Sequence, residues 1–223
     1  MTEDDLELAG RIVSLGDNCE FGFVQRHLGL EPSGLLRWAI AWPENVIALL
    51  ERIAAGDPLE GFFAFPGIEP YNAGMVREPV TGLLFHSQMR SSKDPETGVF
   101  SFQLPDDARR EIHSTEESKF SYLLQKFQST LRDEARLYVI RGTKKLTDAE
   151  ISRVDMLLRG FNPGNRLLVQ TADPERPGTF ETRDDGILIG YVRQLATYVQ
   201  ADCYDREGWA DLIKALRAEL KAY

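Results

Sequence analysis

A cysteine at the junction of an expected strand and an expected helix is the residue most favourably placed for chemistry. Residues 14–22 read SLGDNCEFG, so the thiol of Cys19 follows a short apolar run and lies near a helix start. The N–H groups and the dipole of a helix N-terminus stabilise an anion, which favours the nucleophilic thiolate. Asp17 and Glu20 oppose this effect because neighbouring carboxylates raise the pKa of a thiol. A reactive Cys19 therefore requires a cationic partner.

His86 is the leading candidate for that partner. It ends the apolar run 82–85, and we expect it to emerge from a buried strand at the edge of a sheet. Cysteine followed by histidine is also the chain order of papain-type enzymes. The alternative is structural, because cysteine is among the most buried residue types and a lone histidine beside a strand often only makes a core hydrogen bond.

The remaining histidines and the second cysteine are weaker candidates for chemistry. His27 is expected on the exposed side of its helix, and His113 in a polar linker that precedes a helix. Cys203 lies between Asp202 and Asp205, whose charges suppress the thiolate, so we assign it a structural role.

Arg37 interrupts an apolar stretch and should therefore have a partner. One interpretation is a bidentate clamp for a carboxylate or phosphate of a substrate. The favoured interpretation is a structural ion pair with Asp17 or Glu20, which would also shield Cys19 from their charge. The neighbouring Trp38 and Trp42 are expected to pack in the core rather than to stack on a sugar.

The hydrophobic pattern predicts an α/β fold. Apolar runs predict strands at 11–15, 137–140, 166–170 and 187–192, and helical spacing predicts helices over 19–28, 44–55, 114–131, 147–161 and 209–220. The order strand, helix, strand after residue 137 indicates a right-handed parallel crossover. We predict a single domain over residues 1–223, with a mainly parallel central sheet flanked by helices and a strand-and-loop insertion at 56–105. Residues 1–9 are expected to form a flexible acidic N-terminus.

Composition excludes several classes of protein. The net charge is −9 and only short basic doublets occur, so a nucleic-acid partner is not expected. No apolar run reaches the roughly 18 residues of a membrane span, and the first residues lack the pattern of a secretory signal. Two cysteines cannot form a disulfide framework. These features predict a cytoplasmic protein without membrane insertion.

Motifs for bound cofactors are also missing from the sequence. It contains no phosphate-binding loop, no dinucleotide-binding glycine motif and no zinc helix of the H-E-x-x-H type. With three histidines and two cysteines, a four-ligand zinc site would need nearly all of them to converge. We therefore predict no cofactor and no metal.

Several of these segments together resemble a bacterial family of unknown function whose members are described, from their motifs, as papain-like cysteine peptidases. The resemblance is carried by 14–16 with Asn18-Cys19, by 28–30, by 36–38 and by the later His86, and it is strongest over residues 11–42. Arg37 stands where the family commonly has Asp, and Ser87 stands where an acid often follows the histidine.

The resemblance implies roles for particular residues. Cys19 would be the nucleophile, and His86 its general base and later the acid that protonates the leaving group. The oxyanion would be held by the backbone N–H of Cys19 with Asn18 or Gln25 as a side-chain donor. The group that orients the imidazole stays open among several downstream candidates: Asp94, Asn162, Asn165, Asp202 and Asp205.

Two functions of different classes follow. The first is a thiol-dependent hydrolase or acyl transferase acting on a peptide or acyl ligand. The second is a non-catalytic accessory domain that binds an anionic carbohydrate or a partner protein around Cys19 and Arg37, because the variant resembles domains found beside glycosyltransferases and polysaccharide-assembly proteins. An esterase of the Gly-Asp-Ser type is disfavoured, since Asn18 follows Gly16 and Asp17. The oligomeric state stays open.

Overall fold

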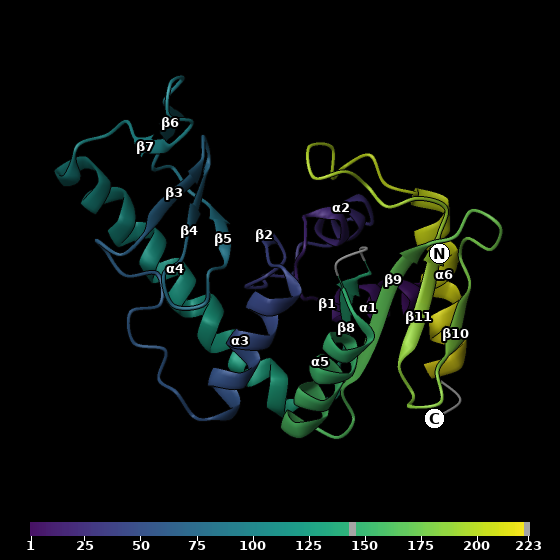
Figure 1. Cartoon of the computed structure of the whole chain (residues 1–223). Coiled ribbons are helices and arrows are strands. Elements are labelled where there is room, and N and C mark those ends of the chain that lie inside the picture. The colour runs from purple at the N-terminus through teal and green to yellow at the C-terminus, as the bar shows by residue number, and fades with distance from the viewer. Residues whose placement is uncertain (143–145, 221–223) are drawn as a thin grey trace.

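A five-stranded sheet, called the central sheet below, lies in the right half of the view in Figure 1. The computed structural model describes residues 1–142 and 146–220. The strands of the central sheet follow the order β1-β8-β9-β11-β10, and all are parallel except β10, which runs antiparallel to β11. This arrangement confirms the predicted mainly parallel sheet. The bounds are β1 (Val13–Ser14), β8 (Leu137–Arg141), β9 (Arg166–Ala172), β10 (Phe180–Thr182) and β11 (Leu188–Val192).

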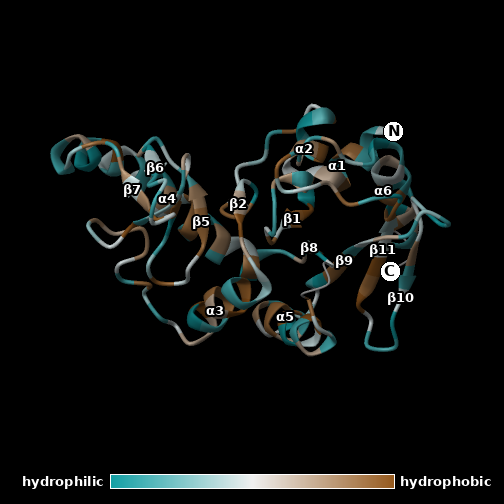
Figure 2. Cartoon of the chain, turned by 45° about the horizontal axis from the view of Figure 1, so that its top comes forward, coloured by the Kyte–Doolittle hydropathy of each residue, from teal (hydrophilic) through white to brown (hydrophobic). Residues whose placement is uncertain are grey.

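Helices cover both faces of this sheet. Side chains alternate across β8, so that Leu137 and Val139 pack with Trp209 on one face, whereas Tyr138 and Ile140 face the other side. Helices α1 (Glu3–Arg11), α2 (Glu20–His27) and α6 (Arg206–Leu220) cover the first face, and α3 (Pro43–Ala54), α4 (Asp106–Asp133) and α5 (Asp148–Phe161) cover the second. Figure 2 shows hydrophobic residues along β11 and hydrophilic ones along the edge strand β10.

The predicted crossover between β8 and β9 is present. Thr147 and Glu150 form a capping box at the start of α5, in which each side chain accepts a hydrogen bond from the backbone N–H of the other. The two strands that flank α5 pair in parallel, with Leu137 opposite Arg166. The capping residues and the apolar spacing of α5 were therefore sufficient to predict this crossover from the sequence.

A second, antiparallel sheet lies beside the first, and the end of one of its strands, at His86, lies next to Cys19. Its order is β2-β5-β4-β3, and β6 and β7 form a separate hairpin. The bounds are β2 (Ala39–Ile40), β3 (Glu69–Asn72), β4 (Met75–Arg77), β5 (Leu84–His86), β6 (Ser91–Lys93) and β7 (Phe100–Phe102). Within the predicted insertion at 56–105, the apolar stretch 61–65 forms turns rather than a strand, and Phe63 has a φ of +57°.

Two expectations about helices are corrected by the structure. Helix α4 begins at Asp106, eight residues before the expected start, because Pro105 caps a first turn that contains two aspartates. The first nine residues are not a flexible segment. Most of them belong to α1, which has a capping box between Thr2 and Asp5 and packs against α6.

Candidate functional site

The turn that carries Cys19 connects β1 to α2 at the carboxyl edge of the central sheet. Gly16 has a φ of +92°, and a Cβ there would lie 2.5 Å from the Cβ of Ala41, so only glycine fits. Asp17 also has a positive φ, of +75°, which aspartate tolerates better than most residues. Cys19 then caps the N-terminus of α2. Backbone geometry thus fixes where the thiol lies.

Cys19 and His86 are brought together across the two sheets. The Sγ of Cys19 lies 3.9 Å from Nε2 of His86, although 67 residues separate them. Strand β2 joins the two sides, because the N–H of Asp17 donates to the carbonyl of Ala41 and Ala39 pairs with Phe85, the neighbour of His86. Cys19 is half-buried and His86 is exposed, so both are accessible.

The protonation states of the pair differ from the expectation. Burial raises the pKa of the Cys19 thiol to about 11. Burial and the charge of Lys119 lower the pKa of His86, while a hydrogen bond to the backbone of Gly74 partly offsets them. The expected lowering of the thiol pKa is therefore wrong, and near neutral pH both groups are uncharged.

The cation that the two acids require is Arg141, the last residue of β8. Its Nη1 lies 3.1 Å from Oδ2 of Asp17, and its Nε lies 3.7 Å from Oε2 of Glu20. The hydroxyl of Tyr198 donates to the other oxygen of Asp17 at 2.6 Å. Sequence reasoning missed Arg141, although a charged residue directly after the buried run 137–140 was a usable signal.

Glu20 accepts hydrogen bonds from β9, from α6 and from the segment after β11. Its Oε1 accepts hydrogen bonds from Gln170 at 2.5 Å and from the indole of Trp209 at 3.0 Å, and its Oε2 accepts from the N–H of Ala196 at 2.9 Å. The side chain is 1% exposed. This buried network fixes the first turn of α2 and with it the position of Cys19.

Arg37 does not pair with Asp17 or Glu20, which corrects the favoured interpretation. Its guanidinium contacts Glu31 at 2.7 Å and donates to the carbonyls of Gly22 and Leu30 at 3.1 and 3.0 Å. It is 5% exposed and connects α2 to the loop that follows it. Arg37 is therefore a structural residue, and a clamp beside Cys19 must come from other groups.

The two candidates for the side-chain oxyanion donor have different environments. Gln25 donates to the carbonyls of Ala9 and Ile12 at 3.0 and 3.1 Å, so its amide is occupied by a structural role. The Oδ1 of Asn18 accepts from the N–H of Glu20 at 2.9 Å. Its Nδ2 is buried and has no hydrogen-bond partner among the residues that the structure describes. Asn18 is thus the candidate with a free donor next to Cys19.

The backbone of Gly74 raises the pKa of His86 against the larger effect of burial, and the side chains proposed as its orienting group make their hydrogen bonds elsewhere. Ser87, which replaces the acid common in the resembled family, donates to Glu116 of α4 at 2.8 Å. The downstream candidates make contacts elsewhere. Asp94 caps a turn of the β6–β7 hairpin, and Asn162 and Asn165 donate to backbone carbonyls at the end of α4. Asp205 accepts from the N–H groups of Arg193 and Gly208, and Asp202 is exposed.

Of the remaining candidates, His113 departs from its expected place. It lies inside α4, is buried, and its Nε2 is 2.6 Å from the carbonyl of Phe63. His27 is exposed, as expected, and Cys203 is also exposed. Trp38 packs edge-on against Phe23.

Among residues 1–142 and 146–220, no three His, Cys, Asp or Glu side chains are arranged so that they could hold a metal ion. Within the same residues, none of the helices has both the length and the apolar character needed to cross a bilayer. Comparisons with protein-family models, with curated proteins and with solved structures found no match.

Proposed function

We propose that this chain is a thiol-dependent hydrolase or acyl transferase in which Cys19 is the nucleophile and His86 the general base. The observation that supports this most is the separation of 3.9 Å between Sγ and Nε2, which is the length of a long hydrogen bond to sulfur and has to shorten in the substrate complex before the proton is transferred. The accessible surface of both residues supports it as well.

The reaction starts from two uncharged groups. The ring nitrogen that faces the sulfur is Nε2, so we assign the hydrogen bond to the Gly74 backbone to Nδ1–H. This tautomer leaves the lone pair of Nε2 directed at the thiol. As the sulfur attacks a carbonyl carbon and the S–C bond forms, the thiol proton passes to Nε2. The imidazolium then protonates the leaving group, whose bond to carbon breaks, and an acyl-thioester remains on Cys19.

The second half of the reaction releases the acyl group. Water, or another nucleophile in a transfer reaction, attacks the thioester while Nε2 of His86 accepts its proton. The C–S bond breaks, and the proton returns to the sulfur. The oxyanion formed in both halves would accept hydrogen bonds from the backbone N–H of Cys19 and from Nδ2 of Asn18, whose donor has no other partner among the described residues.

Acyl-enzyme formation tests this proposal. The full chain is incubated with p-nitrophenyl acetate, and p-nitrophenolate release and protein mass are followed together. We expect a burst and a mass increase of one acetyl group on Cys19, which Cys19→Ala abolishes and Cys203→Ala does not. Acetylation that persists in Cys19→Ala would contradict the assignment of the nucleophile.

The raised pKa of Cys19 favours a second candidate, a non-catalytic domain whose surface around Cys19 binds a partner protein or an anionic carbohydrate of a polysaccharide-assembly system. Arg37 takes no part in such binding because it is buried among backbone carbonyls. In this case Cys19→Ala would bind sulfated or uronic oligosaccharides, used as probes, as tightly as the natural chain does. Neither the natural chain nor this variant would form an acyl intermediate.

A further inference from the structure

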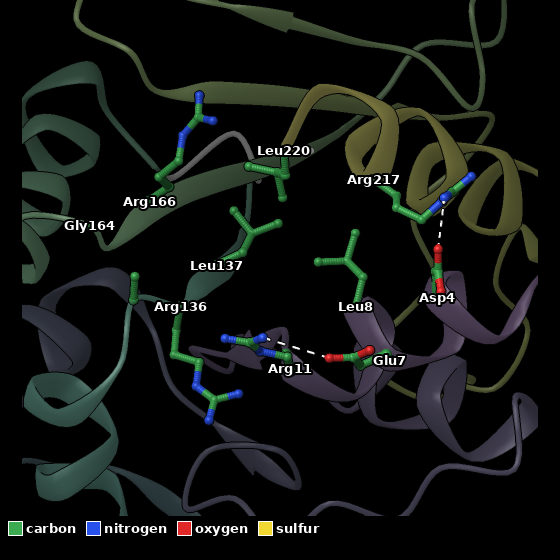
Figure 3. Close-up of a pocket in the computed structure, with 11 residues that line it drawn as sticks. Asp4, Glu7, Leu8, Arg11, Arg136, Leu137, Gly164, Arg166, Arg217 and Leu220 are labelled. Atoms are coloured by element: carbon green, nitrogen blue, oxygen red, sulfur yellow. Dashed lines mark hydrogen bonds and ion pairs between the residues drawn. The ribbon is translucent and has the colours of Figure 1, made fainter. Parts of the chain in front are cut away.

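A pocket unrelated to Cys19 lies at the opposite edge of the central sheet. It has a volume of about 430 Å³ and is lined by the first residues of two strands, Leu137 of β8 and Arg166 of β9, and by α1 and α6 (Figure 3). Cys19 follows the carboxyl end of β1, so the sheet separates the two places. The volume is in the range of small-molecule sites, roughly 300–1,000 Å³.

The middle of this pocket is apolar, and four arginines and two carboxylates, Asp4 and Glu7, line its surroundings. Leu8, Leu137 and Leu220 point toward one another in Figure 3, from α1, β8 and α6 respectively. The guanidinium groups of Arg11 and Arg136 lie together at one side of these leucines. A ligand that fills the pocket therefore meets hydrocarbon at the centre and positive charge at that side.

Arg11 and Arg136 also line a second pocket, of about 160 Å³, between β1 and α4. Lys126 and Arg37 also line it. The charge of Arg37 is already paired with Glu31, and no acidic residue occurs among the described lining residues. The two arginines form the boundary shared by both pockets.

A carboxylate of the chain itself already bridges these two arginines. The Oε2 of Glu134 lies 2.6 Å from Nη2 of Arg136 and 3.7 Å from Nη2 of Arg11. The Glu134 side chain is 59% exposed, so this ion pair is weak and easily exchanged. The other ion pair of Arg11, with Glu7, is 3.8 Å long, and Nε of Arg136 is buried without a partner among the described residues. The carboxylate of a ligand can therefore take the place of Glu134 at these two arginines.

We propose that Arg11 and Arg136 bind the head group of a small amphipathic carboxylate whose hydrocarbon chain lies against Leu8, Leu137 and Leu220. The guanidinium fork matches a carboxylate in geometry and charge, and the exposed Glu134 shows that this pair accepts one. The ligand replaces Glu134 at the arginines. Burial of its chain against the three leucines provides the affinity that the head group alone lacks.

Calorimetric titration of the full chain with octanoate tests this proposal. Acetate supplies the head group without the chain, and 1-octanol supplies the chain without the charge. We expect octanoate to bind at least tenfold more tightly than either. Equal affinity for octanoate and octanol would overturn the proposal, since the arginines would then contribute nothing, and so would the absence of octanoate binding.

Variants separate this site from others on the surface. Arg11→Gln and Arg136→Gln should each weaken octanoate binding about tenfold or more, whereas Arg153→Gln, which removes an exposed arginine of α5, should leave it unchanged. Glu134→Gln should tighten binding, because it removes the competing carboxylate while leaving both arginines. Because Glu134 is exposed, Glu134→Gln tests the proposal even if an arginine variant fails to fold. Unchanged or weaker octanoate binding by Glu134→Gln would overturn the proposal. Cys19→Ala should bind octanoate as the natural chain does.

Discussion

Arg141 lies 3.1 Å from Asp17, although 124 residues separate them in the sequence. This ion pair joins the end of β8 to the turn that carries Cys19, and it is buried on both sides. It neutralises one of the two acids beside the thiol and has a second, longer contact with the other, Glu20. The position of Cys19 therefore depends on a residue at the carboxyl end of β8, the strand that pairs with β1.

Removal of that cation should destabilise the fold. Arg141→Met leaves Asp17 and Glu20 buried without their cation, and loss of one partner of a buried ion pair typically costs about 3–5 kcal/mol. Urea denaturation measures the free energy of unfolding. The control is Arg153→Met, which removes an exposed ion pair with Glu51 and should cost about 0–1 kcal/mol. Equal stability of the two variants would mean that the buried pair has no special role.

Much of the central fold was predictable because local signals agreed with one another. The capping residues Thr147 and Glu150, the apolar run 137–140 and the spacing on α6 each point to one structure. Predictions failed where tertiary contacts decide the outcome. The polar sequence of α1 indicates a flexible segment, yet Ala9 is buried and Asp5 forms an ion pair with Arg217 of α6.

Asn18 offers a test of the oxyanion site. Asn18→Ala removes the buried Nδ2 donor and should lower kcat for p-nitrophenyl acetate by about 100- to 1,000-fold, with a smaller effect on KM. Asn18→Asp keeps an oxygen that accepts from the N–H of Glu20 but lacks the donor, so it should be as slow. Steady-state kinetics measures both. An Asn18→Asp variant with full activity would exclude this role.

The charge of Lys119 should contribute, after burial, to the lowered pKa of His86. Burial and the positive charge of Lys119 hold this pKa below its ordinary value of about 6.5. Lys119→Gln should therefore raise it, and Lys119→Arg should not. NMR titration of the histidine ring protons measures the shift, and identical titration curves for the two variants would contradict the assigned cause.

The lowered pKa of His86 also makes stability depend on pH. As the pH falls below about 6.5, His86 takes up a proton in the unfolded chain before it does so in the folded chain. The free energy of unfolding therefore decreases as the pH falls from about 6.5 to the pKa of His86 in the folded chain. Lys119→Gln should reduce that decrease. Urea denaturation at several pH values measures it, with Lys119→Arg as the control.

The candidate site could be predicted only in part. Cys19 and His86 were found because each follows an apolar run, which places both at strand ends. The partner of Asp17 was wrongly assigned to Arg37, because only the strand order brings Arg141, at the end of β8, next to β1. The roles of Asn18 and Gln25 differ through hydrogen bonds to distant backbone atoms, which spacing does not show.

The reactivity of Cys19 as a function of pH tests the central claim most directly. Alkylation by iodoacetamide is measured between pH 7 and 9 in a Cys203→Ala background. A thiol with a pKa of about 11 and no assistance reacts about tenfold faster for each pH unit, because its thiolate fraction rises in that proportion. With His86 as general base, the rate should instead be high and nearly constant once the imidazole is neutral. His86→Gln should lower the rate at pH 7 at least tenfold and restore the steep pH dependence, whereas His27→Gln, which changes an exposed histidine, should do neither. If the alkylation rate rises steeply with pH while Cys19 and His86 are both present, and His86→Gln leaves that dependence unchanged, the proposed role of His86 is contradicted.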